Sequence, residues 1–100
     1  MNSIILKSCV YVLQLENDKW YIGQTHNMNL RFSQHISNQG ARWTKLHKPI
    51  DCIRTSFLIT EREMTLEYMR LYGWENVRGA GWCSIDMDKP PAELKNHLDI

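Results

Sequence analysis

The sequence has no hydrophobic run of the length that a membrane-spanning helix needs. Such a helix requires about 20 consecutive apolar residues, and every apolar stretch in this chain of 100 residues is much shorter. The N-terminal sequence Met-Asn-Ser-Ile-Ile-Leu-Lys-Ser-Cys has Lys7 inside its apolar patch and no charged region before it, which makes it a poor signal peptide. The sequence therefore predicts a protein that does not associate with membranes.

Paired cysteines are also lacking. The three cysteines, Cys9, Cys52 and Cys83, are scattered and odd in number, and no C-x-x-C pair occurs. A disulfide framework and a zinc site both depend on such pairs. We therefore expect reduced thiols and an intracellular location, in the cytoplasm or the nucleus.

Internal repeats, low-complexity segments and a Walker phosphate-binding loop are absent from the sequence as well. The glycine-rich segment at residues 73–81 lacks the G-K-[ST] ending of a Walker loop. One hundred residues suit one small domain, and four tryptophans and four tyrosines can fill a compact core. We expect a single domain over residues 1–100, in which residues 83–100 form a C-terminal tail.

Net charge is small, at +1, but its distribution along the chain is uneven. Residues 20–60 carry five bases against the single acid Asp51, a net charge of +4 before the histidines are counted. Residues 61–76 carry two arginines against four glutamates, and residues 83–100 carry two lysines against four acids, so each segment has a net charge of −2. A basic middle segment is typical of a face that binds phosphate, and a mixed solvated surface is the alternative.

Three short segments rich in Val, Ile, Leu and Tyr predict strands at residues 9–15, 20–24 and 50–59. The polar sequence Glu-Asn-Asp-Lys between the first two favours a turn, so these two strands should form an antiparallel hairpin. Helices are predicted at residues 27–38 and 60–72, with loops between the elements. The pattern indicates an α+β fold with a small three-stranded antiparallel sheet flanked by helices.

Each strand of the predicted hairpin carries a tyrosine, Tyr11 or Tyr21. A two-residue turn at Asn17 and Asp18 would direct these side chains to opposite faces of the sheet. A three- or five-residue loop, or a bulge, would put both on one face. The sequence alone does not choose between these connections, but a site shared by both tyrosines, as the resemblance described below implies, predicts the longer or bulged one.

Arg31 and His35, four residues apart, lie one above the other on the first predicted helix, which Asn27 can cap. The apolar stripe beside them is formed by Met28, Phe32 and Ile36. Tyrosine, arginine and histidine side chains together can move protons and hold a phosphate.

The second predicted helix begins with a capping box, because Thr60 is followed three residues later by Glu63. Glu67 falls within a stripe that is otherwise apolar, formed by Met64, Tyr68 and Leu71. A carboxylate in such a stripe is costly to bury unless an arginine or a metal ion meets it. In the alternative, the helix buries the stripe through Leu66 and Met69, and Glu67 is half exposed.

An ordered series of residues resembles a known family. The chain has V-Y-V at residues 10–12, Y-I-G at residues 21–23, an arginine ten residues after the second tyrosine, a histidine four residues further on, and a glutamate in the later segment L-E-Y-M-R-L. This series resembles the GIY-YIG nuclease superfamily, and the segments G-A-R-W-T and W-E-N-V-R-G look like parts of its small stand-alone members. The resemblance covers residues 10–82. Cys9 and Val10 stand in place of the Gly and Ile of the name motif, at backbone and packing positions.

The resemblance implies a GIY-YIG-like fold and a metal-dependent DNA endonuclease. Its catalytic set would be Tyr11, Tyr21, Arg31, His35 and Glu67. Glu67 would bind Mg²⁺, for which Mn²⁺ would substitute, and Arg31 would hold phosphate oxygens. Tyr11, Tyr21 and His35 all remain candidates for the general base. The alternative function is a non-catalytic nucleic-acid-binding module on the same scaffold.

Side chains outside this set are candidates for contact with DNA. Arg42, Lys45 and Lys48 would contact its backbone, and Trp43 would either stack on an exposed base or pack beneath the loop. Asn76 would either hydrogen-bond near the site or cap a turn. Because the overall charge is near neutral, a homodimer or a partner protein would supply further DNA affinity.

Overall fold

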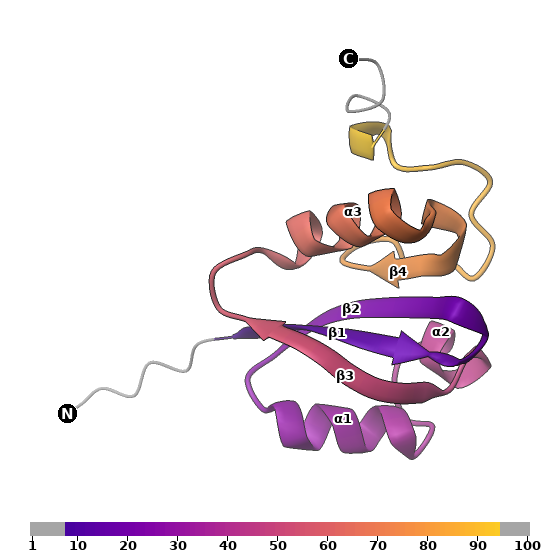
Figure 1. The fold of residues 1–100 in the computed structure, drawn as a ribbon. Coiled ribbons are helices and arrows are strands. Elements are labelled where there is room, and N and C mark those ends of the chain that lie inside the picture. Colours follow the sequence, from indigo (N-terminus) through magenta and orange to yellow (C-terminus); the bar gives the residue numbers. More distant parts are fainter. Residues whose placement is uncertain (1–7, 95–100) are drawn as a thin grey trace.

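The computed structural model describes residues 8–94, which form a sheet with helices on both of its faces (Figure 1). The strands are β1 (Cys9–Leu15), β2 (Lys19–Thr25), β3 (Pro49–Ser56) and β4 (Val77–Gly79). The helices are α1 (Met28–Ile36), α2 (Arg42–Leu46) and α3 (Glu61–Tyr72), and short 3-10 turns span Glu16–Asp18 and Trp74–Asn76. No helix among the described residues is long and apolar enough to cross a membrane.

The sheet has four strands in the order β3-β1-β2-β4. β1 pairs antiparallel with both β2 and β3, whereas β4 runs parallel to β2. The prediction of a three-stranded, antiparallel sheet is therefore wrong in strand number and in the direction of β4. β4 has only three residues and lies in the glycine-rich segment, so it lacks the alternating pattern by which a strand is recognised in a sequence.

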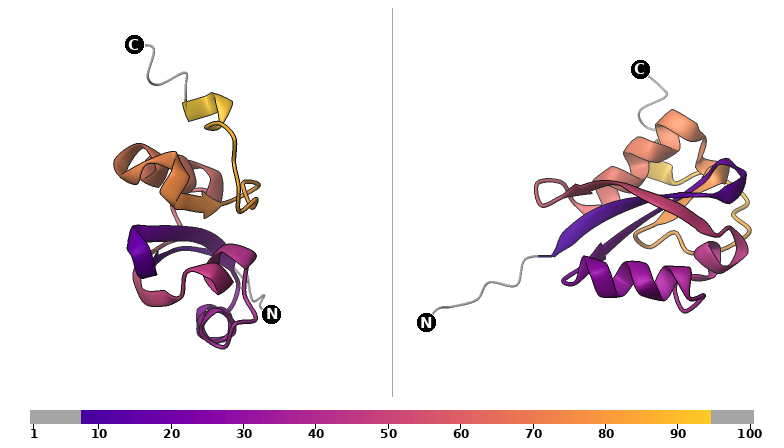
Figure 2. Two further views of the ribbon diagram at one scale, coloured as in Figure 1. Left: turned by 90° about the vertical axis from the view of Figure 1, so that its right-hand side faces the viewer. Right: turned by 60° about the horizontal axis from the view of Figure 1, so that its bottom comes forward.

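The two faces of the sheet carry separate cores. Figures 1 and 2 show α1 and α2 on one face and α3 on the other. On the α3 face, Val10, Val12 and Ile22 pack with Met64 and Met69 of the helix. On the α1 face, the buried side chains are Tyr11, Leu13, Leu15, Tyr21 and Trp43. Alternate residues of β1 thus serve the two cores, because successive side chains of a strand point to opposite faces.

The connection between β1 and β2 decides which face the tyrosines occupy. It is the three-residue turn Glu16–Asp18, in which Asn17 and Asp18 adopt left-handed backbone conformations with φ of 64° and 57°. Asn and Asp are the side chains that best tolerate this conformation. The resulting register places Tyr11 and Tyr21 on the same face, so the prediction of a connection longer than two residues is confirmed.

The first predicted helix is present as α1, and the side chain of its N-cap residue Asn27 accepts a hydrogen bond from the backbone N–H of Leu30. Ile36 is 60% exposed, so its prediction as part of the buried stripe is wrong. His35 is buried in its place. α1 turns His35, and not Ile36, toward the core because the imidazole has hydrogen-bond partners on both sides, Tyr11 in β1 and Thr44 in α2.

A helix, α2, replaces part of the loop expected between α1 and β3. Its five residues are too few to show a helical period, and its N-cap residue Ala41 has no side chain that can cap it. Tertiary contacts stabilise α2 instead. The indole N–H of Trp43 donates a hydrogen bond of 3.0 Å to the backbone oxygen of Trp20 in β2.

α3 begins at the predicted capping box, in which Thr60 and Glu63 exchange side-chain and backbone hydrogen bonds. The helix ends at Tyr72, as predicted, and Gly73 follows as its C-cap with φ of 92°. The buried side chains of α3 are Met64, Thr65, Leu66, Tyr68 and Met69. The helix thus buries members of both predicted stripes, while Leu71 is exposed and Glu67 is only partly buried, as the alternative expected for Glu67.

The described part of the tail packs against the domain. Ile85 contacts the core on the α1 face, and Met87 and Leu94 contact the core on the α3 face. Residues 92–94 are helical, and the sequence pattern through Leu94 and Leu98 also predicts a short helix here, of which the part after Leu94 lies outside the described residues.

Candidate active site

A glycine of β2 leaves the space that the Tyr11 hydroxyl occupies. Gly23 is the cross-strand partner of Tyr11. A Cβ atom at position 23 would lie 2.2 Å from the Tyr11 hydroxyl oxygen, which is far inside contact distance. The neighbouring ring therefore requires glycine at this position, and the hydroxyl can reach α1.

The Tyr11 hydroxyl is the centre of a hydrogen-bond network that joins β1 to α1. Its oxygen lies 2.9 Å from Nε2 of His35 and accepts a hydrogen bond of 3.3 Å from Nε of Arg31. A guanidinium can only donate, so among the described residues His35 is the partner that can accept the phenol proton. The four-residue spacing of Arg31 and His35 on one helix brings both to the same oxygen, as the sequence predicted.

The other ring nitrogen of His35 contacts α2. Nδ1 lies 2.9 Å from the Thr44 hydroxyl oxygen, and that hydroxyl donates a hydrogen bond of 2.9 Å to the backbone oxygen of Ala41. Gly40 lies against the same edge of the ring, because a Cβ atom there would be 2.1 Å from Nδ1. The sequence interpretation missed Thr44. The available signal was its place in the G-A-R-W-T segment, to which no chemistry was assigned.

Burial governs the protonation of this pair. Burial, assisted by the positive charge of Arg31, lowers the pKa of His35 to about 4. Burial raises the pKa of Tyr11 to about 12, and the hydrogen bond from Arg31 opposes that shift. At neutral pH the phenol therefore holds its proton, and the imidazole is uncharged, so that Nε2 can accept the hydrogen bond of the phenol.

Tyr21 lies beside this pair and nearer to the surface. Its ring centroid is 6.4 Å from that of Tyr11 and 5.3 Å from that of His35. Burial raises the pKa of Tyr21 as well, and the charge of Arg31 opposes that shift. Tyr21 is 9% exposed whereas Tyr11 is 0% exposed, so Tyr21 is the outer member of the two phenols.

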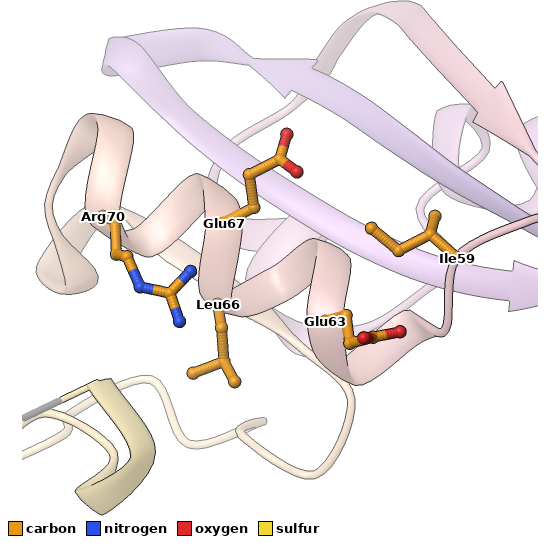
Figure 3. Close-up of a pocket in the computed structure, with 5 residues that line it drawn as sticks. All are labelled: Ile59, Glu63, Leu66, Glu67 and Arg70. Atoms are coloured by element: carbon orange, nitrogen blue, oxygen red, sulfur yellow. The ribbon is translucent and has the colours of Figure 1, made fainter. Parts of the chain in front are cut away.

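Glu67 lies on α3 and is paired with a cation of β3. Its carboxylate is 2.7 Å from Nη1 of Arg54, and the two side chains are 38% and 42% exposed. Figure 3 shows Glu67 pointing toward the strands and away from Leu66, beside a hollow of about 350 Å³. Among residues 8–94, the Glu67 carboxylate forms its ion pair and its hydrogen bond with Arg54. Neither interaction joins it to Tyr11 or Tyr21.

A second carboxylate, that of Glu61 in the first turn of α3, acts on both tyrosines. After burial, which is the main cause, the negative charge of Glu61 contributes to the raised pKa of Tyr11 and of Tyr21. Burial raises the pKa of Glu61 itself, and the backbone N–H of Ala80 opposes that shift. The sequence interpretation missed Glu61 because acids are common in the first turn of a helix for electrostatic reasons alone.

The sequence of this chain matches the GIY-YIG catalytic domain over residues 7–75, which is most of its length. The chain belongs to the GIY-YIG family. It is 34% identical over 59 residues to the UPF0213 protein YazA of Bacillus subtilis (strain 168), a match that covers 58% of this chain and 60% of YazA. It is 33% identical over 60 residues to the UPF0213 protein BH0048 of Halalkalibacterium halodurans, covering 59% of this chain and 64% of that protein.

A viral relative shares a shorter segment with this GIY-YIG chain. The UPF0213 protein in the VLF1-GP41 intergenic region of Autographa californica nuclear polyhedrosis virus is 50% identical over 34 residues, covering 34% of this chain and 33% of that protein. The chain thus matches less than two thirds of the length of each of these three relatives. No solved structure matches the chain significantly.

The carboxylates of this GIY-YIG domain fit a divalent metal of the Mg²⁺ type. Among residues 8–94, no three His, Cys, Asp or Glu side chains gather as a metal cluster. Mg²⁺ does not need such a cluster, because it keeps several waters and is bound through one or two carboxylates together with substrate phosphates. Glu61 and Glu67 supply hard oxygen ligands of this kind.

The basic side chains predicted to contact DNA lie on α2 and just after it. Arg42, Lys45 and Lys48 are all exposed. Arg42 and Lys45, together with Leu46 and Ile85, line a hollow of about 290 Å³. Because Thr44 of the same helix contacts His35, this basic surface lies next to the tyrosine network.

The two remaining candidates have structural partners. Trp43 is 4% exposed and lies beneath the guanidinium of Arg78, which is 4.3 Å from its ring centroid, so the packing alternative describes it. The amide of Asn76 donates a hydrogen bond of 2.8 Å to the backbone oxygen of Tyr72 and accepts one of 2.8 Å from Lys19. Asn76 therefore caps the turn after α3.

Proposed function

We propose that this GIY-YIG protein is a metal-dependent endonuclease that hydrolyses phosphodiester bonds in DNA. The observation that carries the proposal is the network in which Arg31, Tyr11 and His35 meet at one phenol oxygen. A cation suited to phosphate, a phenol and a neutral imidazole that accepts the phenol proton are together the parts of a proton relay next to a phosphate.

Arg31 would hold the scissile phosphate. Its side chain is partly exposed, and it donates hydrogen bonds to Tyr11 through Nε and to Gln34 through Nη1. The planar guanidinium matches phosphate oxygens, and this attraction strengthens as charge builds up in the transition state. When Arg31 turns toward the phosphate, it uncovers the Tyr11 hydroxyl, whose side chain is fully covered in the free protein. Substrate binding and access to the relay are therefore coupled.

Tyr11 and His35 would remove the proton of the attacking water together. The water proton passes to the Tyr11 oxygen while the proton of Tyr11 passes to Nε2 of His35. A free phenolate is not needed on this path, which suits a phenol whose pKa is raised to about 12 by burial. Tyr21 orients the water from the exposed side. A relay of this type contributes about 10²- to 10⁴-fold to a hydrolysis rate.

A metal held at α3 would act as a Lewis acid on the phosphate and the leaving oxygen. Glu61 is one candidate ligand, because its negative charge is among the smaller contributions, after burial, to the raised pKa of both tyrosines. Glu67, to which the family resemblance points, would have to leave Arg54 before it could bind a metal. The assignment to Glu67 stays a prediction, and the experiment below separates the two residues.

A second candidate function is DNA binding without cleavage. The complete burial of Tyr11 and the neutralisation of Glu67 by Arg54 are what a scaffold that has lost catalysis would retain. Such a module would bind DNA through the exposed cations Arg42 and Lys45 and would show no turnover with any metal.

A nicking assay on supercoiled plasmid with Mg²⁺ or Mn²⁺ tests the proposal. The unaltered protein is expected to nick the plasmid, and Tyr11→Phe, which removes only the hydroxyl, to slow nicking by about a hundredfold or more. Glu61→Gln and Glu67→Gln are tested side by side, and loss of nicking in Glu61→Gln with activity retained in Glu67→Gln would assign the metal to Glu61. Tyr72→Phe is the matched control, because Tyr72 is an exposed phenol of α3 outside the network.

Each other outcome of this assay has a defined meaning. Activity that survives in Glu61→Gln and disappears in Glu67→Gln would assign the metal to Glu67. Tyr11→Phe as active as the unaltered protein would refute the relay. Absence of nicking with both metals, combined with salt-sensitive DNA binding, would support the binding module.

A further inference from the structure

Thr44 takes no part in the mechanism above, yet it is buried against the imidazole at the centre of that mechanism. Its side chain is 1% exposed and lies on α2, nine residues after His35. Its hydroxyl oxygen is 2.9 Å from Nδ1 of His35 and also contacts the backbone oxygen of Ala41 at 2.9 Å. Two partners for one hydroxyl raise the question of which group donates to which.

The direction of the hydrogen bonds is set at the Arg31 end of the network. Arg31 has no acceptor, so its Nε–H donates to the Tyr11 oxygen. The proton of the buried phenol then needs an acceptor, and among the described residues this is Nε2 of His35. If Nε2 carried a hydrogen instead, the phenol proton would be an unsatisfied buried donor, which is unfavourable.

The direction is set in the same sense at the Ala41 end. The backbone oxygen of Ala41 can only accept, and it accepts from the Thr44 hydroxyl and from the backbone N–H of Lys45. The single proton of Thr44 is thereby used, so its oxygen is an acceptor toward His35. Nδ1 of His35 must then be the nitrogen that carries the hydrogen. Donor and acceptor roles agree along the whole series from Arg31 to Ala41.

We propose that Thr44 is a positioning residue that holds His35 in the Nδ1–H tautomer, and so keeps Nε2 free to receive the proton of Tyr11. In that transfer the O–H bond of Tyr11 breaks and an N–H bond forms at Nε2. The resulting imidazolium keeps its Nδ1–H hydrogen bond to Thr44. The catalytic part of this inference rests on the proposed nuclease function, whereas the tautomer does not.

Gly40 lies against the edge of the His35 imidazole that carries Nδ1. A Cβ atom at position 40 would be 2.1 Å from Nδ1 and 2.8 Å from Cε1 of His35. The absence of a Cβ atom at Gly40 therefore leaves the space in which the Nδ1 edge of the imidazole lies beside the backbone before α2. In this ring orientation, Tyr11 requires an acceptor at Nε2 and Thr44 requires a donor at Nδ1, so the two hydroxyls together favour the Nδ1–H tautomer.

Long-range proton–nitrogen NMR of the ¹⁵N-labelled protein near pH 7 reports the tautomer directly. The unaltered protein is expected to show His35 with hydrogen on Nδ1 and a bare Nε2. Thr44→Val, which keeps the shape but lacks the hydroxyl, should lose this state in favour of a tautomer mixture or of Nε2–H. Thr44→Ser restores the hydroxyl and should restore the Nδ1–H signal. Nε2–H in the unaltered protein, or an unchanged signal in folded Thr44→Val, would overturn the proposal.

A matched control separates the tautomer from general destabilisation. Thr65→Val removes another fully buried hydroxyl, which donates to the backbone oxygen of Glu61. It should lower thermal stability to a similar extent and leave the His35 signals unchanged. If Thr65→Val shifted the tautomer as much as Thr44→Val, the effect of Thr44 would be unspecific and the proposal would fail.

The nicking rate tests the catalytic consequence. Thr44→Val is expected to lower the rate at saturating plasmid by roughly tenfold to a hundredfold, as is usual when the partner that orients a histidine is lost. Thr44→Ser should recover most of that loss. An unaltered protein that does not nick at all would refute the nuclease proposal and leave the NMR result to decide the tautomer. A Thr44→Val variant that changes tautomer and nicks at full rate would refute the positioning role.

Discussion

At the scale of single residues, two glycines of this protein are required by side chains and not by turns. Gly23 lies against the hydroxyl of Tyr11, and Gly40 lies against Nδ1 of His35. Each position lacks a Cβ atom where a side chain of the proposed relay passes. Gly23, the third residue of the Y-I-G motif, is thus explained by Tyr11 on the neighbouring strand, whose hydroxyl would otherwise have no space.

The stability of the protein should depend on the protonation of His35. Burial and the charge of Arg31 lower its folded pKa to about 4, below the value of about 6.5 in an unfolded chain. Between these two values the unfolded chain binds a proton that the folded protein does not, so stability falls as pH falls. His47, whose pKa burial also lowers, acts in the same direction, and Glu61, whose pKa burial raises, acts in the opposite one.

Urea unfolding at pH 7 and at pH 4.5 measures this dependence. Between pH 7 and pH 4.5, the free energy of unfolding of the unaltered protein is expected to fall by about 2 kcal/mol more than that of His35→Gln. At pH 4.5 His35 is mostly protonated in the unfolded chain and mostly unprotonated in the folded protein, whereas glutamine does not titrate. The comparison removes the contributions of His47 and Glu61, which both proteins share. An equal loss in the two proteins would mean that His35 is protonated in the folded state.

At the scale of elements, α2 and β4 depend on the buried cation of Arg78. This side chain is 2% exposed, and its guanidinium lies over the ring of Trp43 in α2. It donates hydrogen bonds to the backbone oxygens of Trp74, Val77, Ser84 and Ile85. One side chain of β4 thereby joins the turn after α3, the tail and α2. Neither element has a strong local signal, so this contact explains how both are held.

Arg78→Lys is expected to destabilise the protein by about 2 kcal/mol or more. An ammonium group has three donors on a single atom and cannot reach four carbonyl oxygens as the planar guanidinium does. Urea unfolding measures the change, and Arg42→Lys, at an exposed position of α2, is the control with an expected effect within about 0.5 kcal/mol. If the two variants were equally stable, Arg78 would not hold these elements together.

At the scale of the whole molecule, the proposed site draws on both layers that cover the sheet. α1 and α2 supply Arg31, His35 and Thr44 from one face, and the first turn of α3 supplies Glu61 (Figure 1). The strands contribute the two tyrosines. In the proposed function, this arrangement would let a small domain surround one phosphate with a cation, a proton relay and a carboxylate.

Binding of this protein to DNA should weaken as salt concentration rises. The exposed cations Arg42, Lys45 and Lys48 would each neutralise a phosphate and release a counterion. Lys45→Ala is expected to reduce the slope of log affinity against log salt by about 1 for duplexes of any sequence. Fluorescence anisotropy over a salt series measures the slope, and Lys89→Ala, an exposed lysine of the acidic tail, should leave it unchanged. An unaltered slope in Lys45→Ala would place the DNA elsewhere.

The sequence by itself determined the features whose causes are local. Asn27 and the pair of Thr60 and Glu63 begin their helices as predicted, because a cap needs only residues within one turn. The four-residue spacing of Arg31 and His35 puts them on one face for the same reason. The family series also follows from the order of residues alone, and the match over residues 7–75 agrees with it.

Only the tertiary structure decided the features that depend on residues far apart in the chain. The strand β4 exists because its backbone pairs with β2, and α2 exists because Trp43 and Thr44 are buried against other elements. The pairing of Glu67 with Arg54 and the effect of Glu61 on the tyrosines likewise depend on how α3 lies on the sheet. Hydrogen bonds and charges act through space. A pattern along the chain therefore does not show which of the two carboxylates, Glu61 or Glu67, acts on the tyrosines.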